Sequence, residues 1–417
     1  MGGMGSTPGT GFGGATDPGA IVITEGYRLV PSVMVGERYD SNVFFVPKAA
    51  LTAGQEREDF VTTTIPTIRG LYMGRSLSAN VYASAVGEYY AKNPNLSYVG
   101  TNLGASLDMS RLLDGLRPTS TWQVTEYYSF TPIPPAFATG DVTGSSNPYL
   151  TGYQTVRTNT QVNSTGTNVS VPLTQTLSVT GSYMYSFAKY GATASGVQQP
   201  GGFPLLSSAT HSYTAGLATR LSGADTLNVR YAGSFSDYGS GGGSFVANGA
   251  TVGWVHLFSQ RASMTANAGV QLVQTAFPGA SNSSIYTPTG SLIGTFGDRT
   301  TKLTYSWFLG VIPAVQFQPQ PLINNTLSLA LTQLTPVHNL IGLLGLNYSR
   351  ADALGSSASV PVSYYSYGAN AGLTYRATIK TFLGLNVGYQ NFHNDFGGTS
   401  YTVPRTTVQL TLTQALY

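Results

Sequence analysis

The sequence contains no cysteine. That absence excludes disulfide bonds, thiolate metal sites, iron–sulfur clusters and haem attached through a C-x-x-C-H motif. Charge is scarce as well, since Asp, Glu, Lys and Arg make up 9% of the residues, against about 25% in an average soluble domain. A soluble chain of 417 residues would need more charge on its surface. The net charge of +3 is too small to indicate nucleic-acid binding.

Long apolar runs are missing too. The longest, residues 309–317, is interrupted by Pro313 and falls short of the ~18 residues of a transmembrane helix. Residues 1–17 lack the basic start and apolar core of a signal peptide, so we expect the numbering to begin near the mature terminus. Helical periodicity is nearly absent. A membrane protein of this kind would have to be a closed β-barrel, because only helices and barrels satisfy every backbone polar group in lipid.

What is present is alternation with a period of two. Residues 1–26 are rich in Gly, Ser, Thr and Pro and are predicted to form a flexible periplasmic tail. After them, apolar and polar residues alternate in runs that often exceed ten residues, as in 381–390, and tilted membrane-spanning strands need ~9–11. The polar positions are mostly Ser, Thr and Asn, and tyrosines such as Tyr89, Tyr128 and Tyr348 stand near segment ends. Both features are typical of outer-membrane barrels with interfacial aromatic girdles.

The connections between these segments alternate between short and long. The long ones are 45–58, 132–153, 191–208, 276–284 and 351–362, and the tight ones are near 74–75, 172–175, 222–225, 259–260, 297–299 and 378–379. Short periplasmic turns and longer extracellular loops are characteristic of outer-membrane barrels. We therefore predict an all-β, transmembrane, antiparallel up-and-down barrel over residues 27–417, located in the outer membrane of a Gram-negative cell.

Counting segments predicts eighteen strands, or sixteen if one hairpin merges between Ile285 and Leu334. Either number leaves room for an aqueous channel. The predicted starts lie near Tyr27, Asp59, Leu77, Tyr98, Thr119, Thr155, Thr176, His211, Thr226, Val246, Arg261, Ile285, Thr300, Thr326, Asn339, Ser363, Thr381 and Tyr401.

Charged residues on the polar face of these strands are the candidate site. Charge on the lipid face costs ~2–4 kcal/mol at mid-membrane for Arg or Lys, so an inward position is favoured. The parity of each position, that is, whether it falls on the polar or the apolar side of its alternating strand, predicts ten lumen-lining residues. Seven are basic and three acidic: Arg38, Arg69, Arg157, Arg220, Arg230, Lys302 and Arg376 with Asp40, Glu88 and Asp108. They either filter solutes by charge or brace the wall by pairing with one another. Glu37 and Glu126 have outward parity, which predicts a position at the rim or a bulge that resets the phase.

No catalytic, metal or cofactor site is predicted. The four histidines fall on separate segments without ligand spacing. His393 and Asp395 form the one histidine–carboxylate neighbour pair. They are interpreted as polar residues near a strand end, because no G-x-S-x-G nucleophile elbow accompanies them.

Two stretches carry a family resemblance. Residues 35–44 read VGERYDSNVF and residues 59–66 read DFVTTTIP, and a YYAKNP strand end follows at 89–94. Together they resemble the β-barrel porins encoded beside exopolysaccharide and exosortase systems. The resemblance covers the first three strands, implies an outer-membrane barrel and carries over no catalytic residue. One departure is the last segment, where the apolar face of Val408, Leu410 and Leu412 is out of phase with Tyr417.

The sequence thus predicts a passive channel for small solutes that prefers anions weakly, narrowed by the connections 132–153 and 191–208. The alternative is a structural or partner-binding barrel that anchors a surface assembly or serves a polymer-export or electron-transfer partner. The expected partners are outer-membrane lipid and small solutes, and a periplasmic or extracellular protein partner is a further alternative. The sequence is compatible with both a monomer and a trimer.

Overall fold

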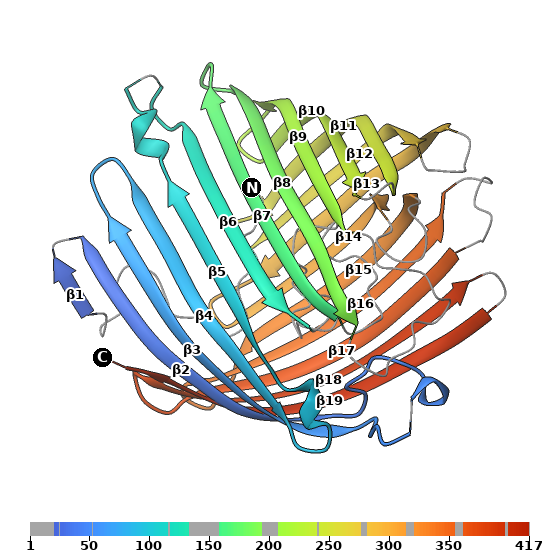
Figure 1. Cartoon of the computed structure of the whole chain (residues 1–417). Coiled ribbons are helices and arrows are strands. Elements are labelled where there is room, and N and C mark those ends of the chain that lie inside the picture. Colours follow the sequence, from blue (N-terminus) through green and yellow to red (C-terminus); the bar gives the residue numbers. More distant parts are fainter. Residues whose placement is uncertain are drawn as a thin grey trace.

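The computed structural model is one large sheet curled into a barrel (Figure 1). It describes residues 21–416 except 25, 52, 116, 133–157, 194–206, 240–241, 277–281, 314–320, 355–361 and 397–398. In this part of the chain, no helix is long and apolar enough to cross a membrane.

The strands follow one another in chain order around the sheet. They are β1 (Ile21–Thr24), β2 (Tyr27–Asp40), β3 (Asp59–Met73), β4 (Ser78–Tyr90), β5 (Tyr98–Asp108), β6 (Thr121–Thr131), β7 (Thr158–Pro172), β8 (Leu177–Thr193), β9 (Ser208–Arg220), β10 (Asp225–Tyr238), β11 (Gly243–Ser259), β12 (Ala262–Ala276), β13 (Ser283–Gly297), β14 (Thr301–Pro313), β15 (Pro321–Leu334), β16 (Leu340–Ala353), β17 (Val362–Arg376), β18 (Thr381–Phe396) and β19 (Thr399–Ala415). Within the described residues, three short 3-10 helices lie between strands: η1 (Lys48–Ala50), η2 (Pro94–Leu96) and η3 (Ser110–Leu112).

The barrel closes where the last strand meets the second. Thr407–Ala415 of β19 pair antiparallel with Ser32–Asp40 of β2, and every other strand of the ring pairs with its chain neighbours. The ring of β2 to β19 confirms eighteen strands, not sixteen. Residues 285–334, where the sequence pattern is weakest, contain the separate strands β13, β14 and β15. The tight turn 298–300 separates β13 from β14, and β14 then pairs with β15.

The additional strand β1 lies inside the segment predicted as a tail. It pairs with Tyr27–Leu29 of β2, next to the point where β19 ends opposite Ser32. Its four residues are Ile, Val, Ile and Thr, which are β-branched and favour strands. The predicted tail is therefore wrong for residues 21–24, which extend the edge of β2, and residues 1–20 lie outside the described residues.

The two ends of the barrel differ. At one end, hereafter the tight-turn end, strands are joined by short connections such as 173–176, 221–224, 260–261 and 298–300. The opposite, long-loop end carries 41–58, 132–157 and 194–207. The tight turns predicted from the sequence all fall at the first end, together with the start of β2 and the end of β19.

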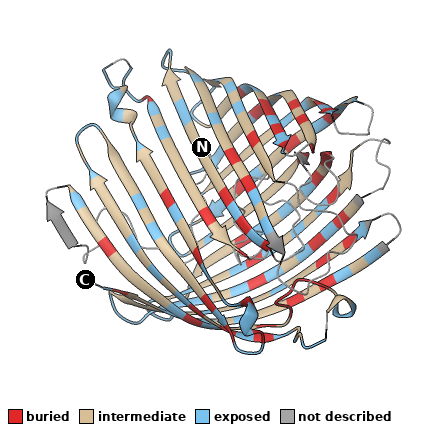
Figure 2. Cartoon of the chain, viewed as in Figure 1, coloured by how far each residue is buried: buried red, intermediate tan, exposed pale blue. Residues whose placement is uncertain are grey.

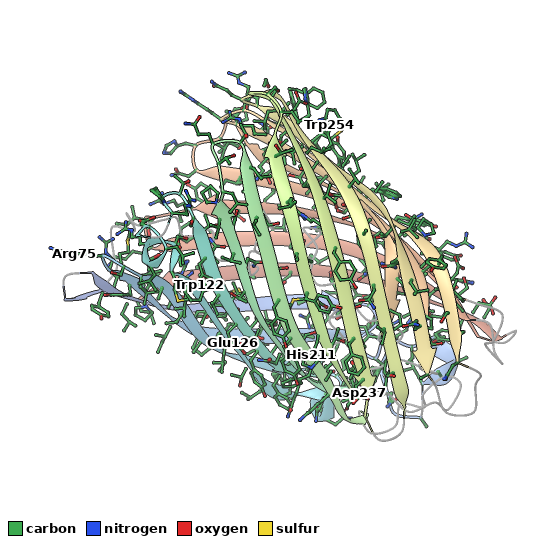
Figure 3. The ribbon with its side chains drawn as sticks, turned by 90° about the horizontal axis from the view of Figure 1, so that it is seen from above. Arg75, Trp122, Glu126, His211, Asp237 and Trp254 are labelled. Atoms are coloured by element: carbon green, nitrogen blue, oxygen red, sulfur yellow. The ribbon has the colours of Figure 1, made fainter. Side chains whose placement is uncertain are left out.

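Side chains alternate between an outer and an inner face. On β10, Val229 and Tyr231 are about half exposed, whereas Asn228 and Ser234 on the other face are buried. Exposed aromatic residues recur near both ends of the outer face. Figure 3 shows Trp122 and Trp254 towards the tight-turn end and His211 and Asp237 towards the long-loop end. An apolar outer band between aromatic belts is the surface expected of a barrel in lipid.

Glycine and tyrosine meet across neighbouring strands. A Cβ atom added to Gly294 of β13 would lie within 2.3 Å of the Tyr305 ring of β14, and one added to Gly104 of β5 within 2.2 Å of the Tyr82 ring of β4. The ring thus covers the backbone of the glycine opposite it. Tyr305 covers its glycine on the outer face and Tyr82 on the inner face, since their strand neighbours Leu303 and Ser84 lie on those faces.

Candidate functional site

The inner face of the barrel is a lattice of small polar side chains. Hydroxyl groups of neighbouring strands hydrogen-bond in pairs: Ser182 with Thr214 at 2.7 Å, Ser263 with Thr295 at 2.8 Å and Ser306 with Ser328 at 2.6 Å. Asn267 Nδ2 donates to Ser291 Oγ at 2.9 Å in the same layer. These groups satisfy one another along the wall, so the inner surface is polar and uncharged at these positions.

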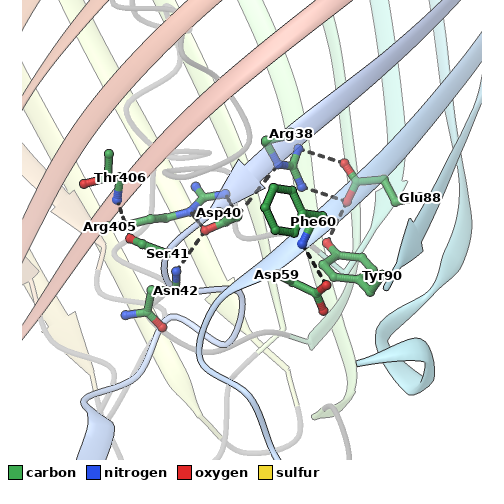
Figure 4. Close-up of polar contacts among 10 residues, drawn as sticks. All are labelled: Arg38, Asp40, Ser41, Asn42, Asp59, Phe60, Glu88, Tyr90, Arg405 and Thr406. Carbon is green, nitrogen blue, oxygen red and sulfur yellow. Dashed lines mark hydrogen bonds and ion pairs between the residues drawn. The ribbon is translucent and has the colours of Figure 1, made fainter. Parts of the chain in front are cut away.

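A buried ion network lies on the inner face near the long-loop end (Figure 4). The Arg38 guanidinium donates to both carboxylate oxygens of Glu88, at 2.9 and 3.1 Å. Arg405 Nη2 donates to Asp40 Oδ2 at 2.6 Å, and Arg38 Nε lies 3.7 Å from the same oxygen. Tyr90 donates its hydroxyl proton to Glu88 at 2.6 Å. Two guanidinium groups thus face two carboxylates, and their charges cancel.

Loop 41–58 packs on top of this network. Val43, Phe44 and Val46 are at most 1% exposed and contact Val61 and Tyr90 of the inner face. Phe45 packs against Phe392 and Val403 and lies under the Arg405 guanidinium, whose carbon is 4.7 Å from the ring centre. Phe45 has a φ of 59°, a left-handed conformation that is uncommon outside glycine. The first part of this loop is therefore held against the inner wall.

Burial is distributed unevenly along the barrel. Figure 2 shows buried residues gathered towards the long-loop end of the strands. A second inner cluster there joins Tyr238, Phe245, Ala247 and Val273. At the tight-turn end most inner side chains are partly or fully exposed. Inner-face side chains are thus packed against one another at the long-loop end and accessible at the tight-turn end.

The remaining predicted charges line the accessible part. Arg230 is exposed and, among the described residues, its side chain makes no ion pair or hydrogen bond, and the same holds for Lys302. Arg69 donates through Nε to Asn80 Oδ1 at 2.8 Å. All three lie on the inner-facing parity of their strands, within the half nearer the tight turns.

Three further predicted residues belong to the tight-turn rim. Arg220 Nε donates to the Ser222 carbonyl at 3.1 Å, which holds it to its own turn. Asp108 Oδ1 accepts from the Ser110 backbone N–H at 3.0 Å. Arg376 is exposed at the last position of β17. Arg157 lies outside the described residues, as does most of the two connections predicted to narrow the lumen.

Sequence reasoning missed Arg405. The residue is 6% exposed and is the main partner of Asp40. The signal that predicts its inward direction is the alternation along β19. Val408, Leu410 and Leu412 occupy the even-numbered positions, and their side chains are exposed on the outer face. Alternation from these positions back along β19 places residue 405 on the inner face.

Glu37 and Glu126 both point outward, and only Glu37 fits the prediction. Glu37 is near the long-loop end of β2 and accepts from Thr62 Oγ1 at 2.8 Å. Glu126 is in the middle of β6, and the pairing of β6 with β5 and β7 is continuous, without a bulge. The prediction of a rim position or a bulge is therefore wrong for Glu126, because its strand has regular pairing on both sides.

His393 and Asp395 lie on the outer face of β18 and not in the lumen. The His393 ring stacks on Tyr365 with 4.6 Å between ring centres, and its nitrogens are 3.0 and 3.1 Å from the Thr402 and Ser400 hydroxyls. Across the described residues, no group of three or more His, Asp or Glu side chains could hold a metal ion. The pair is part of the aromatic belt at the long-loop end.

Comparisons with known proteins give remote structural similarities. No protein-family model matches the chain, and no curated protein matches it either. Among solved structures, Pseudomonas aeruginosa OccK3 (OpdO) has a TM-score of 0.45 and 12% identity, over 93% of this chain and 96% of that one. Acinetobacter baumannii OccAB3 has a TM-score of 0.46 and 8% identity, over 93% and 99%. At this level of similarity, conclusions about the chain depend on its own residues.

Proposed function

We propose that the chain is an outer-membrane channel through which small solutes diffuse passively. The observation that supports this most directly is the closed ring of eighteen strands with a lattice of Ser, Thr and Asn on its inner face. Barrels of 16–18 strands enclose an aqueous lumen. The outer face exposes large apolar side chains such as Leu385 and Leu410, which favours a location in lipid.

We also propose a weak preference for anions. Arg38, Arg405, Asp40 and Glu88 compensate one another, so this network braces the wall and adds little net field. Arg230 and Lys302 make no ion pair among the described residues, and Arg69 donates to Asn80 on the same inner face. A lumen with low-dielectric walls focuses the field of these cations and concentrates anions. The Debye length is ~8 Å at physiological salt, so the preference should be modest.

The test is the zero-current potential of the purified protein in planar bilayers under a KCl gradient. The parent should favour chloride, and a double variant Arg69→Ala with Arg230→Ala should move the potential towards zero. Arg350→Ala is the matched control, because that arginine is exposed on the outer face beside Asp352. A parent that prefers K⁺, or a double variant with the parent's potential, would contradict the filtering role.

A second candidate function is a structural or partner-binding barrel. The observation that favours it is the inward loop 41–58, whose residues Val43, Phe44, Phe45 and Val46 are buried against the inner wall. An association with exopolysaccharide or exosortase systems, which the family resemblance implies, also stays a prediction. The conductance of the parent protein in planar bilayers distinguishes the two functions. An open channel gives a steady current, and a plugged or filled barrel gives none.

A further inference from the structure

A row of aromatic and cationic side chains crosses the inner wall near mid-depth. Arg69 of β3 pairs directly with Tyr82 of β4. Gly104 of β5 pairs with both Tyr82 and Tyr127 of β6, and so lies between them. Partners in register share a face of the sheet, and Ile68, the neighbour of Arg69 along its strand, is exposed on the outer face. This row, hereafter the tyrosine strip, therefore faces the lumen on four adjacent strands (Figure 1).

The ring of Tyr82 is turned sideways along this wall. A Cβ atom added to Gly104 would lie 2.2 Å from Cε1 of Tyr82, 2.6 Å from its Cζ and 2.8 Å from its hydroxyl oxygen. The far end of the ring therefore lies over β5, on the side of Tyr127. Gly104 and Tyr127 are each the seventh of the eleven residues of their strands. The strip thus forms an apolar shelf with two phenol hydroxyls halfway along the wall.

The strip differs from the other tyrosines of the inner face. Among the described residues, those others lie at the long-loop end, and Tyr90, Tyr238 and Tyr364 are each 1% exposed. Tyr82 and Tyr127 are instead partly exposed. A solute in the lumen can therefore reach their rings, whereas the tyrosines of the long-loop end are covered by protein.

Hydroxyl and amide groups flank the strip on both sides, about 7 Å away, which is two residues along each strand. These side chains are Ser84, Asn102 and Ser129 towards the long-loop end and Asn80, Ser106 and Thr125 towards the tight-turn end. Ser129 Oγ donates to Asn102 Oδ1 at 2.8 Å. Arg69 Nε donates to Asn80 Oδ1 at 2.8 Å, which holds the guanidinium beside the strip.

This arrangement matches a sugar ring better than other small solutes. A pyranose has C–H groups on the faces of its ring and hydroxyl groups around its edge. The C–H face can pack on a tyrosine ring and remove apolar area from water, while the hydroxyl groups donate to and accept from the flanking rows. An aromatic acid would need apolar surface on both of its faces and would leave the two polar rows unused. An inorganic anion would use Arg69 alone.

We propose that the tyrosine strip and its two flanking rows bind pyranose sugars in the lumen. The proposal rests on the proposed channel function and names a class of solute for it. Tyr82 and Tyr127 supply the apolar surface, and Arg69 and Asn80 donate to the hydroxyl oxygens of the sugar. The shelf covers one face of the sugar, so binding is weak and release is fast, as passage through a channel requires.

The test measures the ion current of the purified protein in planar bilayers while cellobiose is added. Sorbitol, which has the hydroxyl groups of a sugar without its ring, is the control solute, and benzoate represents aromatic acids. The variants are Tyr82→Leu and Tyr127→Leu. Phe308→Leu is the matched control, because Phe308 is a partly exposed inner-face aromatic residue on β14, halfway round the ring of strands from β5. Calorimetry measures the binding of cellobiose to each purified protein in parallel.

We expect cellobiose to reduce the current of the parent reversibly. Each leucine variant should need about tenfold more cellobiose for the same reduction, since one ring contact is lost. Phe308→Leu should match the parent. Gly104→Ala should also weaken the block, because the added Cβ displaces the Tyr82 ring without removing it. Equal block by sorbitol, block by benzoate but not by cellobiose, or leucine variants as sensitive as the parent would each overturn the proposal.

Failure of the site and failure of the channel give different results. A parent that conducts but neither binds cellobiose nor is blocked by it overturns the site and leaves the channel standing. A parent that conducts nothing yet binds cellobiose, with weaker binding in both leucine variants, contradicts the channel and supports the site. Heat-modifiable migration in gels reports whether each variant folds. If a leucine variant does not fold, Gly104→Ala decides, and parent-like binding by that variant would overturn the proposal.

Discussion

Arg405 and Asp40 are separated by 365 residues in the chain, yet Arg405 Nη2 lies 2.6 Å from Asp40 Oδ2. The pair joins β19 to β2 at the level where their pairing ends, at Asp40 opposite Thr407. Beyond that point Ser41 continues the contact, donating its backbone N–H to the Thr406 carbonyl at 3.0 Å. The ion pair therefore fastens the closing seam of the barrel.

Arg405→Ala should destabilise the barrel strongly. Its removal leaves Asp40, which is 1% exposed, as a buried carboxylate without its main cation, and such a loss costs about 3–5 kcal/mol. The measurement is the temperature of heat-induced unfolding in gels. Arg350→Ala is the control, since Arg350 and Asp352 are exposed and exposed pairs contribute about 0–1 kcal/mol. Equal unfolding temperatures for the two variants would show that the seam does not depend on this pair.

Parity on β18 can be tested at two adjacent positions. Leu385→Arg should impair assembly, because Leu385 is exposed on the outer face and Arg in lipid costs about 2–4 kcal/mol at the midplane. Asn386→Arg should be tolerated, because that side chain faces the lumen. The amount of folded protein in the outer membrane is the readout. Val179→Arg and Ser178→Arg repeat the comparison on β8, and equal tolerance within both pairs would refute the assignment of faces.

The turn at Asp298 predicts a dependence on pH. Asp298 Oδ1 accepts backbone N–H bonds from Thr300 and Thr301, both at 2.8 Å, and these bonds lower the pKa of its carboxyl below the usual value. A lowered pKa in the folded state adds stability that is complete above the ordinary value of about 3.9 and is lost as the pH falls through the folded pKa. Asp298→Ala should therefore unfold at a lower temperature than the parent at pH 7.

The difference between parent and Asp298→Ala should shrink in acid, when the parent carboxyl is protonated. Asp298→Asn keeps an oxygen acceptor but has no charge to lose, so it should lie between them at neutral pH. An Asp298→Ala deficit of the same size at pH 7 and below the lowered pKa would show that the charge plays no part.

Orientation can be tested with protease on intact cells. The long-loop end should face outward, so cleavage is expected within 132–153 or 191–208, and not at the tight turns 173–176 or 221–224. Disrupted cells serve as the control for access to the turns. Cleavage at a tight turn in intact cells would reverse the topology.

The strands were predictable because their pattern is local. The predicted starts Tyr27, Asp59, Tyr98 and Thr381 coincide with those of β2, β3, β5 and β18. Alternation predicts that β15 starts near Thr326, but the strand starts at Pro321. Pro321, Leu322 and Ile323 are apolar on both faces, so alternation does not mark them. Inner residues at the packed end can be apolar because other side chains of the lumen cover them.

The partners of the charges were not predictable in the same way. Parity placed Arg38, Asp40 and Glu88 on one face, but their assignment to bracing depends on which strands meet when the ring closes. Asp40 meets Arg405 only through the β19–β2 pairing, which alternation along a single strand does not contain. The depth of Glu126 likewise follows from the register of three strands.

The tyrosine rings that cover Gly104 and Gly294 link two features of the composition. The 50 glycines and 27 tyrosines look like separate excesses, but at these sites the small residue is what gives the large one its place. A side chain at position 294 would push the Tyr305 ring off the wall, and loss of the ring would leave the backbone at 294 uncovered. In evolution, the two positions of each such pair should therefore change together, and a sequence that loses the glycine should lose the tyrosine on the adjoining strand as well.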